Sequence, residues 1–310
     1  MRRTGFKNSL QVLFERITVG SLLREYGANY ISQNQVTKEQ RSLIHLLSAC
    51  RTAGLGSHFE QCDHCGYTVK SYNSCRNRHC PVCQQKDKLE WLDKRMKELL
   101  PAGYYHLVFT LPHELGPLCL QNKKVMYGLL FKAVSQTLLE LTRDVKHLGA
   151  DIGLVCVLHT WSQNLKEHPH LHCIMPAGGL SFDREHWVHV SDKNNFFIAG
   201  KVLAKKFRGK FLDLLKQARE KGELDFHGKL AAIKGPVQFN RFLMPLYQKS
   251  WVVNVQKPMG SPEKILEYLS MYVFRIAITD QCIFLRFRTL SPAESGQRIL
   301  EVKDGKVHFS

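Results

Sequence analysis

The segment of residues 56–85 constrains the fold of this chain more than any other. It is rich in Cys, His, Asn and Arg and poor in large aliphatic residues, so it cannot build a hydrophobic core of its own. Six of the 10 cysteines of the chain lie between Cys50 and Cys83. Crowded cysteines of this kind are typical of metal binding in a reducing compartment, so we expect a metal-held fold in the cytosol.

Two Cys-x-x-Cys pairs in this region supply the predicted zinc ligands, Cys62 with Cys65 and Cys80 with Cys83. Their separation is typical of a structural tetrahedral site, in which four thiolates at about 2.3 Å saturate the ion. Four more residues are candidate ligands, and with them the segment has enough donors for one or two ions: Cys50, His58, Cys75 and His79. For each of these four, a buried thiol or a surface histidine without metal is an equally good interpretation.

The charge of the chain indicates a polyanionic partner. Lys and Arg number 44 against 27 Asp and Glu, a formal net charge of +17, and neutralising phosphates releases counterions. Basic residues gather in the cysteine segment and on a helix predicted over residues 201–220, and the predicted DNA contacts are Arg76, Arg78, Lys205, Lys206 and Arg208. No run reaches the eighteen or so apolar residues of a membrane span, and polar residues interrupt the apolar stretch near the N-terminus. We therefore expect neither a membrane segment nor a signal peptide.

A histidine pair opens a predicted buried strand, residues 170–176. Side chains alternate faces along a strand, so His170 and His172 point the same way and can hold one metal ion. His159 is the best third ligand, because it lies on the preceding predicted strand, although a histidine packed in the core is the alternative for it. Imidazole ligands suit Mn²⁺ better than Mg²⁺, but Mg²⁺ is abundant in cells. Either cation would polarise a scissile phosphate and hold it in line.

Two tyrosines lie one turn apart on a helix predicted over residues 262–274. Residues four apart are neighbours on a helix, so Tyr268 and Tyr272 present both phenols to one place. A phenol with a pKa of about 10 must lose its proton before it attacks a phosphate. Packing in the core is the commoner role of such a pair, and the upstream histidines are what favour catalysis. Together the histidines and tyrosines predict cleavage of nucleic acid through a phosphotyrosine.

The order of the predicted elements favours an α+β fold, with a central antiparallel sheet flanked by helices and a small helical, zinc-binding domain in front of it. The predicted strands are residues 104–111, 154–161, 170–176, 251–255 and 275–278, and further helices are predicted over 86–100 and 125–141. Thr37 and Gln40 form a predicted capping box at the start of a helix. The expected domains are a helical and zinc-binding DNA-binding domain (1–100), a nuclease domain (101–280) and an atypical C-terminal segment (281–310).

Several motifs resemble the two-tyrosine HUH transposases of rolling-circle insertion sequences, the insertion-sequence-ninety-one group. They are His159-Thr-Trp-Ser-Gln-Asn-Leu, His168-Pro-His-Leu-His-Cys, Gly178-Gly179, Cys50-Arg-Thr-Ala-Gly-Leu-Gly with His58, Tyr72-Asn-Ser-Cys-Arg-Asn-Arg-His-Cys-Pro-Val-Cys-Gln84, and Tyr105-His-Leu-Val-Phe-Thr-Leu-Pro112. The resemblance covers about residues 20–280. It implies an HUH nuclease fold with a zinc-binding N-terminal domain. It also implies a bacterial, cytoplasmic transposase that cleaves and rejoins single-stranded transposon ends through a 5′-phosphotyrosine.

Two alternatives to an active transposase remain open on the sequence. Residues 281–296 depart from the family pattern, which resumes at Arg298, and family members continue past Ser310. One alternative is therefore an inactive, truncated transposase that only binds DNA. The other is a relaxase or replication initiator, which would use the same chemistry but is not expected to carry the zinc segment.

Overall fold

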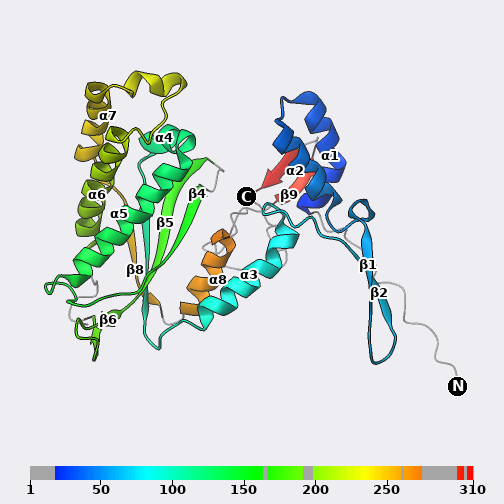
Figure 1. Ribbon diagram of the computed structural model, residues 1–310, viewed down its shortest axis with the longest axis horizontal. Coiled ribbons are helices and arrows are strands. Elements are labelled where there is room, and N and C mark those ends of the chain that lie inside the picture. The colour runs from blue at the N-terminus through cyan, green and yellow to red at the C-terminus, as the bar shows by residue number, and fades with distance from the viewer. Residues whose placement is uncertain are drawn as a thin grey trace. The chain divides into compact units, whose positions relative to one another are not determined.

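The computed structural model describes residues 18–162, 166–190, 198–259, 262–273, 299–303 and 306–309 (Figure 1). It divides the chain into two compact units, one made of Met1–Leu89 with Ile276–Ser310 and the other of Glu90–Arg275. The division lies inside helix α3 (Pro81–Met96), whereas the sequence placed it after residue 100. The C-terminal hairpin groups with the first unit. Residues 275–298, which include a predicted strand and the departure from the family pattern, lie outside the described residues.

The first unit consists of short elements. They are α1 (Val19–Gln33), α2 (Lys38–Ala49), a 3-10 turn η1 (Ala53–Leu55), β1 (Ser57–Gln61), β2 (Thr68–Tyr72), the start of α3, and the hairpin of β9 (Ile299–Lys303) and β10 (Lys306–Phe309). The predicted capping box of α2 is confirmed, because the Thr37 hydroxyl accepts from the Gln40 N–H (3.2 Å) and the Gln40 amide oxygen accepts from the Thr37 N–H (2.9 Å). Helices α1 and α2 pack closely at Gly27, where an added Cβ would lie 2.8 Å from Cγ2 of Ile44.

A four-stranded antiparallel sheet with the order β4-β5-β3-β8 forms the centre of the second unit. Its strands are β3 (Tyr104–Thr110), β4 (Val155–Trp161), β5 (Glu167–Pro176) and β8 (Val253–Met259). Helices and small elements surround it: η2 (His113–Leu115), α4 (Gly116–Gln121), α5 (Lys123–Arg143), β6 (Gly178–Leu180), β7 (Trp187–His189), α6 (Gly200–Glu220), η3 (Gly228–Ile233), α7 (Pro236–Gln248) and α8 (Pro262–Val273). The α+β class with a central antiparallel sheet is confirmed.

The two faces of the sheet carry different residues. On one face, Leu171 and Cys173 of β5 join the main hydrophobic core with α5 and α6, where the Phe109 and Phe207 rings meet edge to face at 5.2 Å. On the other face, Ile174 follows the two histidines of β5, and helix α8 packs there through three buried side chains, Ile265, Leu266 and Leu269. We refer to this second face as the histidine face. Among the described helices, none has both the length and the apolar composition needed to cross a membrane.

Strand β5 begins three residues earlier than predicted. The sequence predicted a polar loop over residues 162–169, and proline, which cannot donate a hydrogen bond to a neighbouring strand, is uncommon inside a central strand. In the structure Pro169 lies within β5, and its carbonyl accepts the N–H of Leu111 (3.1 Å). The strand therefore continues through Pro169, although the missing N–H removes one hydrogen bond between strands. His168 also belongs to β5.

Candidate active site and zinc centre

Pairing of β4 with β5 brings the three predicted histidine ligands together. His159 lies directly opposite His170, and His172 follows two residues later on the same face, opposite Val157. His159 Nδ1 is 2.9 Å from His170 Nε2, and the ring centroids of His170 and His172 are 4.9 Å apart. One ring nitrogen from each histidine lies within 4.8 Å of the other two, and all three side chains are buried. The cluster is therefore large enough for one ion with three imidazole ligands.

Hydrogen bonds to the outer nitrogens orient the rings. His170 Nδ1 lies 2.6 Å from the carbonyl oxygen of His168, to which it donates, so His170 Nε2 offers its lone pair. That lone pair accepts the Nδ1–H of His159 at 2.9 Å. A cation with nitrogens at about 2.1 Å holds two adjacent ligand atoms about 3 Å apart, so an ion that displaced the proton between these two nitrogens would need little change in their spacing.

His106 and Gln256 belong to the same cluster, and the sequence reasoning missed both. His106 of β3 is buried, and its Nε2 lies 2.9 Å from Nδ1 of His172, while its Nδ1 lies 3.0 Å from the Gln256 side-chain oxygen on β8. The His106 and His172 rings are nearly parallel, with 12° between their planes and 5.2 Å between their centroids. If the Gln256 oxygen accepts from His106, then His106 accepts from His172, which leaves His172 Nε2 directed to a metal.

Burial keeps these imidazoles neutral. Desolvation, with smaller contributions from neighbouring histidines, lowers the pKa of His159 to about 3 and that of His172 to about 2. Burial also lowers the pKa values of His170 and His106. At neutral pH all four rings therefore keep a lone pair, which is the protonation state that a metal ligand needs.

Helix α8, which carries the two tyrosine positions, packs on the histidine face. Its buried Leu266 and Leu269 pack with Val157 of β4, the residue opposite His172. Tyr268 and Tyr272 lie on α8 one turn apart, about 6 Å along the axis, and their side chains are outside the described residues. The helix that carries both candidate nucleophiles thus covers the same sheet face as the three histidines.

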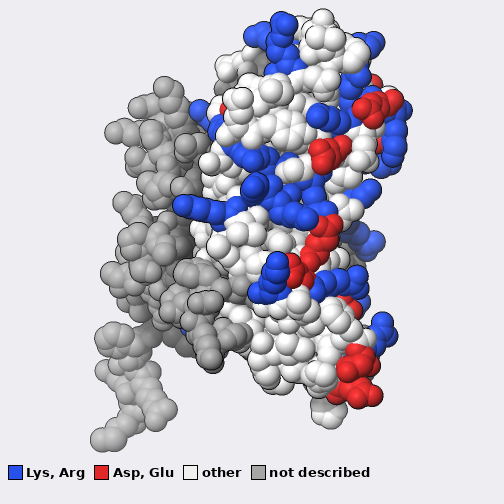
Figure 2. Space-filling model, turned by 90° about the vertical axis from the view of Figure 1, so that its left-hand side faces the viewer, with Lys and Arg blue, Asp and Glu red and all other residues white. Residues whose placement is uncertain are grey.

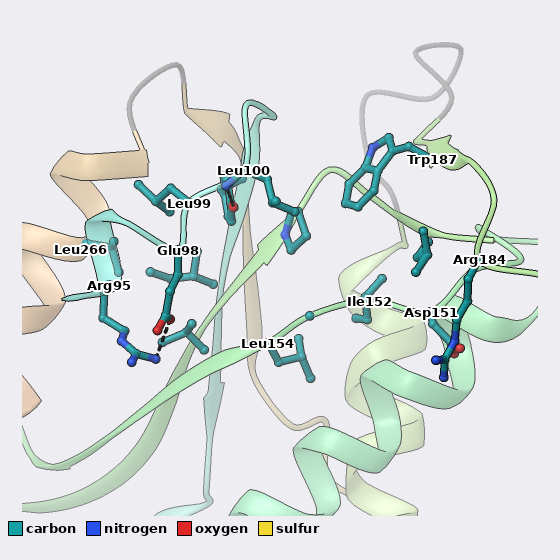
Figure 3. Close-up of a pocket in the computed structure, with 16 residues that line it drawn as sticks. Arg95, Glu98, Leu99, Leu100, Asp151, Ile152, Leu154, Arg184, Trp187 and Leu266 are labelled. Atoms are coloured by element: carbon teal, nitrogen blue, oxygen red, sulfur yellow. Dashed lines mark hydrogen bonds and ion pairs between the residues drawn. The ribbon is translucent and has the colours of Figure 1, made fainter. Parts of the chain in front are cut away.

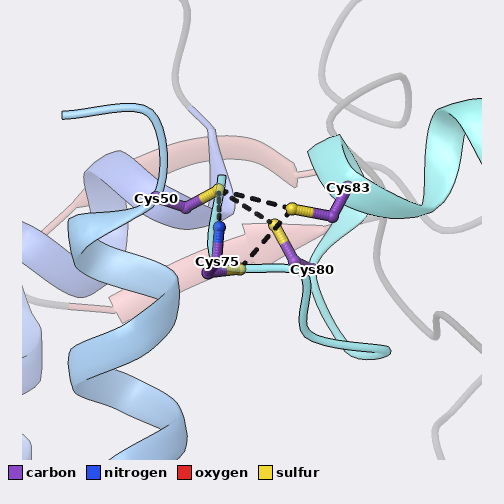
Figure 4. A group of neighbouring side chains, drawn as sticks. All are labelled: Cys50, Cys75, Cys80 and Cys83. Atoms are coloured by element: carbon purple, nitrogen blue, oxygen red, sulfur yellow. Dashed lines mark hydrogen bonds between the residues drawn. The ribbon is translucent and has the colours of Figure 1, made fainter. Parts of the chain in front are cut away.

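Four thiols of the first unit form a second cluster (Figure 4). Cys50 ends α2, Cys75 follows β2, and Cys80 and Cys83 lie at the start of α3. The Sγ–Sγ distances of Cys50–Cys83, Cys75–Cys83 and Cys50–Cys80 are each 3.6 Å. Four thiolates at about 2.3 Å around a tetrahedral zinc lie about 3.8 Å apart, so the cluster has the dimensions of a Cys₄ zinc site.

The remaining predicted zinc ligands lie elsewhere. Cys62 and Cys65 are exposed in the turn between β1 and β2, about 17 Å along the hairpin from its base. His58 contacts Asn73 (2.8 Å) and Glu60 (3.2 Å), and His79 is exposed next to Arg78, which donates to its ring at 3.4 Å. The structure thus joins one predicted Cys-x-x-Cys pair to Cys50 and Cys75, whereas the spacing joined the two pairs to each other.

Burial raises the pKa values of two thiols in this cluster. Desolvation raises the pKa of Cys75 to about 11 and that of Cys80 further. Thiols with such pKa values stay protonated at neutral pH, and a bound cation reverses this by stabilising the thiolates. The donor set therefore fits a zinc ion.

The predicted DNA contacts lie on two surfaces. Arg76 and Arg78 are exposed beside the thiol cluster of the first unit, and Arg76 has a left-handed backbone (φ 49°). On α6 of the second unit, Lys205 and Lys206 are exposed, and Lys206 pairs with Glu140 of α5 at 2.8 Å, while Arg208 donates to the Lys249 carbonyl at 2.8 Å. Figure 2 shows Lys and Arg gathered in a band on the side where α5, α6 and α7 lie in Figure 1.

Two family models match the chain. A model described as “Transposase zinc-binding domain” covers residues 22–111, which include the four clustered thiols. A model described as “Putative transposase” covers residues 153–290, which include the three histidines and helix α8. No solved structure matches the chain significantly.

Two curated relatives are similar over most of this chain. A protein named “Putative transposase y4qJ” from Sinorhizobium fredii is 41% identical over 292 residues, which are 94% of this chain and 69% of the relative. The transposase for insertion sequence element IS801 of Pseudomonas savastanoi pv. phaseolicola is 28% identical over 254 residues, 81% of this chain and 57% of the relative. With both models and both relatives in agreement, this chain belongs to the insertion-sequence-ninety-one family of transposases.

Proposed function

We propose that this transposase cleaves and rejoins single strands of DNA at the ends of its transposon, through a covalent 5′-phosphotyrosine. The observation that carries the proposal is the position of the three buried histidines on the sheet face that α8 covers. A metal ligand set and two tyrosine positions on one face are the parts that a strand-transferring nuclease needs. The wide excess of Lys and Arg supplies attraction for the phosphate backbone.

His159, His170 and His172 would hold a Mg²⁺ or Mn²⁺ ion, which when bound supplies Lewis-acid polarisation of the scissile phosphate. The phenolate of Tyr268 or Tyr272 attacks phosphorus, the bond to the 3′ oxygen breaks, and that oxygen takes up a proton as a free 3′-hydroxyl. The phosphodiester energy is kept in the tyrosine ester. A 3′-hydroxyl therefore rejoins the strand by the reverse attack, without ATP.

The two tyrosines divide the work in this proposal. In-line attack needs reacting atoms about 3–3.5 Å apart, whereas the two positions lie four residues apart, about 6 Å along the helix axis. One phenol is therefore the nucleophile of the first cleavage, and the other acts on a second strand end. We expect one Tyr→Phe substitution to abolish the first cleavage and the other to spare it but block completed transposition.

The first unit would hold the DNA in this scheme. Cys50, Cys75, Cys80 and Cys83 bind a structural zinc ion, and the loop that joins them exposes Arg76 and Arg78. A zinc-held loop with exposed arginines positions phosphates through charge-assisted hydrogen bonds. On the second unit, Lys205, Lys206 and Arg208 of α6 extend the basic surface.

A cleavage assay tests the proposal. Purified protein with Mn²⁺ and labelled single-stranded oligonucleotides from both transposon ends should yield a covalent adduct that survives denaturation. His170→Ala and the double variant Tyr268→Phe/Tyr272→Phe should bind the same strands without forming it. Salt-sensitive binding with no adduct for any end sequence would show that the protein binds DNA without cleaving it. Preferential cleavage of plasmid-origin strands would indicate a replication initiator instead.

A further inference from the structure

A cavity of about 510 Å³ opens on the histidine face of the second unit (Figure 3). Its walls come from the end of β5, the start of β4, helix α8 and the β6–β7 hairpin, and include Arg95, Leu154, Ile174, Arg184, Trp187 and Leu266. Ile174 and Pro176 continue the β5 row that begins with His170 and His172, so the cavity and the histidine cluster share one face of one sheet. The volume lies in the range of small-ligand sites, about 300–1,000 Å³.

Two adjacent glycines, Gly178 and Gly179, leave room for close packing around Trp187 in this cavity. A Cβ at Gly178 would lie 2.7 Å from Cε2 of Trp187, and a Cβ at Gly179 would lie 2.6 Å from the carbonyl oxygen of Asp151. Both contacts are closer than real Cβ atoms come, so a side chain at Gly178 would displace the Trp187 indole and one at Gly179 would push the hairpin away from Asp151. The glycine pair of the sequence therefore holds the Trp187 indole at the wall of the cavity.

Arg184 adds a cation at a strained position. It lies in the turn of the same hairpin with a φ of 64°, in the left-handed region where glycine is preferred. A long basic side chain held in that conformation is an unfavourable local choice, and such choices gather at functional sites. The two acids that line the cavity are already paired: Asp151 with Arg143 at 2.6 Å, and Glu98 with Arg95 at 2.7 Å. The cavity thus combines an aromatic wall and an apolar floor with one arginine, Arg184, that pairs with neither of these acids.

We propose that this cavity binds one unpaired base of the DNA strand, stacked on Trp187, with a phosphate of the same strand contacting Arg184. The inference rests on the proposed function, because it takes the strand to run across the histidine face. Every base offers a face for stacking, and stacking with an aromatic side chain is a common mode of single-strand binding. The site would therefore fix the position of the strand relative to the metal ligands.

The register of β5 limits which base would enter. Four residues separate His172 from Pro176 at the edge of the cavity, about 13 Å along the strand. Nucleotides stacked as in a duplex rise about 3.4 Å each, so 13 Å corresponds to about four nucleotides, and to fewer in an extended strand. The bound base therefore lies within about four nucleotides of the scissile phosphate.

Abasic-site scanning of the strand tests this proposal. Full-length protein carrying Tyr268→Phe/Tyr272→Phe leaves the strand intact, and fluorescence anisotropy measures its affinity for transposon-end strands that each lack one base. We expect one position within about four nucleotides of the cleavage site where loss of the base weakens binding about 5- to 100-fold. Adding Trp187→Ala should weaken binding of the complete strand equally and remove the dependence on that base. Phe182→Ala, which removes an exposed aromatic outside the cavity on the same hairpin, should change neither result.

Arg184→Gly is a second variant, and we expect it to weaken binding without destabilising the fold. Glycine relieves the left-handed backbone, so this variant should unfold at the same or a higher temperature while it binds the strand more weakly. Unchanged affinity of both Arg184→Gly and Trp187→Ala, or a flat abasic profile in a protein that forms the covalent adduct, would overturn the cavity proposal alone. Failure of the wild-type chain to bind any single strand would overturn the proposed function together with it.

Discussion

The thiol cluster of the first unit and the histidine cluster of the second are built in opposite ways. Around the thiols the buried residues are few: Leu47, Cys50 and Cys80 form the core, and every residue of β1 is exposed. Around the histidines, a continuous core of strands and helices holds β4 and β5 in register. The comparison teaches that zinc binding would supply much of the folding free energy of the first unit, whereas the core of the second unit positions the proposed metal ligands.

Zinc removal should give the largest difference between the two units. Zinc binding to peptides of this kind is worth about 10–16 kcal/mol at pH 7, and the first unit has little other core. Chelation or Cys80→Ser should therefore unfold the first unit, seen as lost amide protection by hydrogen exchange. All four tryptophans lie in the second unit, so tryptophan fluorescence should stay native.

Cys62→Ser is the matched control for the zinc experiment. Its thiol is exposed in the hairpin turn, outside the four-thiol cluster, so zinc content and amide protection should match the wild type. Loss of zinc from Cys62→Ser, with retention in Cys50→Ser, would restore the ligand set that the spacing predicted.

Acid should destabilise the second unit without its metal. The folded pKa values of His159 and His172, about 3 and about 2, lie below the ordinary value near 6.5, so the unfolded chain binds more protons. Their contribution is fully present above pH 6.5 and is lost as the pH falls, at about 1.4 kcal/mol per pH unit for each ring. Urea unfolding followed by tryptophan fluorescence, with chelator present, measures this slope between pH 7 and pH 5. His172→Gln should lower this slope by the contribution of one histidine, about 1.4 kcal/mol per pH unit. An unchanged slope would contradict the lowered pKa of His172.

Substitution of a histidine ligand should remove metal binding and leave the fold. His170→Ala is expected to lower the affinity for Mn²⁺ more than about 100-fold, since losing an outer partner alone costs about 10–100-fold. Titration calorimetry measures the affinity, and the tryptophan unfolding transition should remain cooperative. A variant that unfolds as the zinc-free first unit does would break the comparison between the two sites.

The smallest effect is expected at His106, which contacts the proposed metal ligand His172. His106→Phe keeps an aromatic ring but removes both nitrogens, so Mn²⁺ affinity should fall about 10–100-fold. Gln256→Leu should weaken binding in the same direction, whereas Gln256→Glu, which also accepts from His106, should preserve it. His113→Phe replaces an exposed histidine of the same unit and serves as the control. Equal affinity in His106→Phe and His113→Phe would show that the ring of His172 needs no partner.

Local chemistry decided much of this protein. Alternation along residues 170–176 was enough to predict that His170 and His172 share a face, and the Thr37–Gln40 capping box marked the start of α2. These predictions succeed because they depend only on backbone periodicity and on side chains a few residues apart. The α+β class also follows from the order of such local elements.

Tertiary structure alone decided which distant residues meet. Cys62 and Cys80 belong to pairs with equally good spacing. The first pair lies at the far end of the β1–β2 hairpin, whereas Cys50, at the end of α2, lies next to Cys80. His106 reaches His172 because β3 lies next to β5 in the sheet, although the two residues are far apart in the chain. Spacing along a chain records neither the direction of a hairpin nor the order of strands, because both are set by the packing of the whole core.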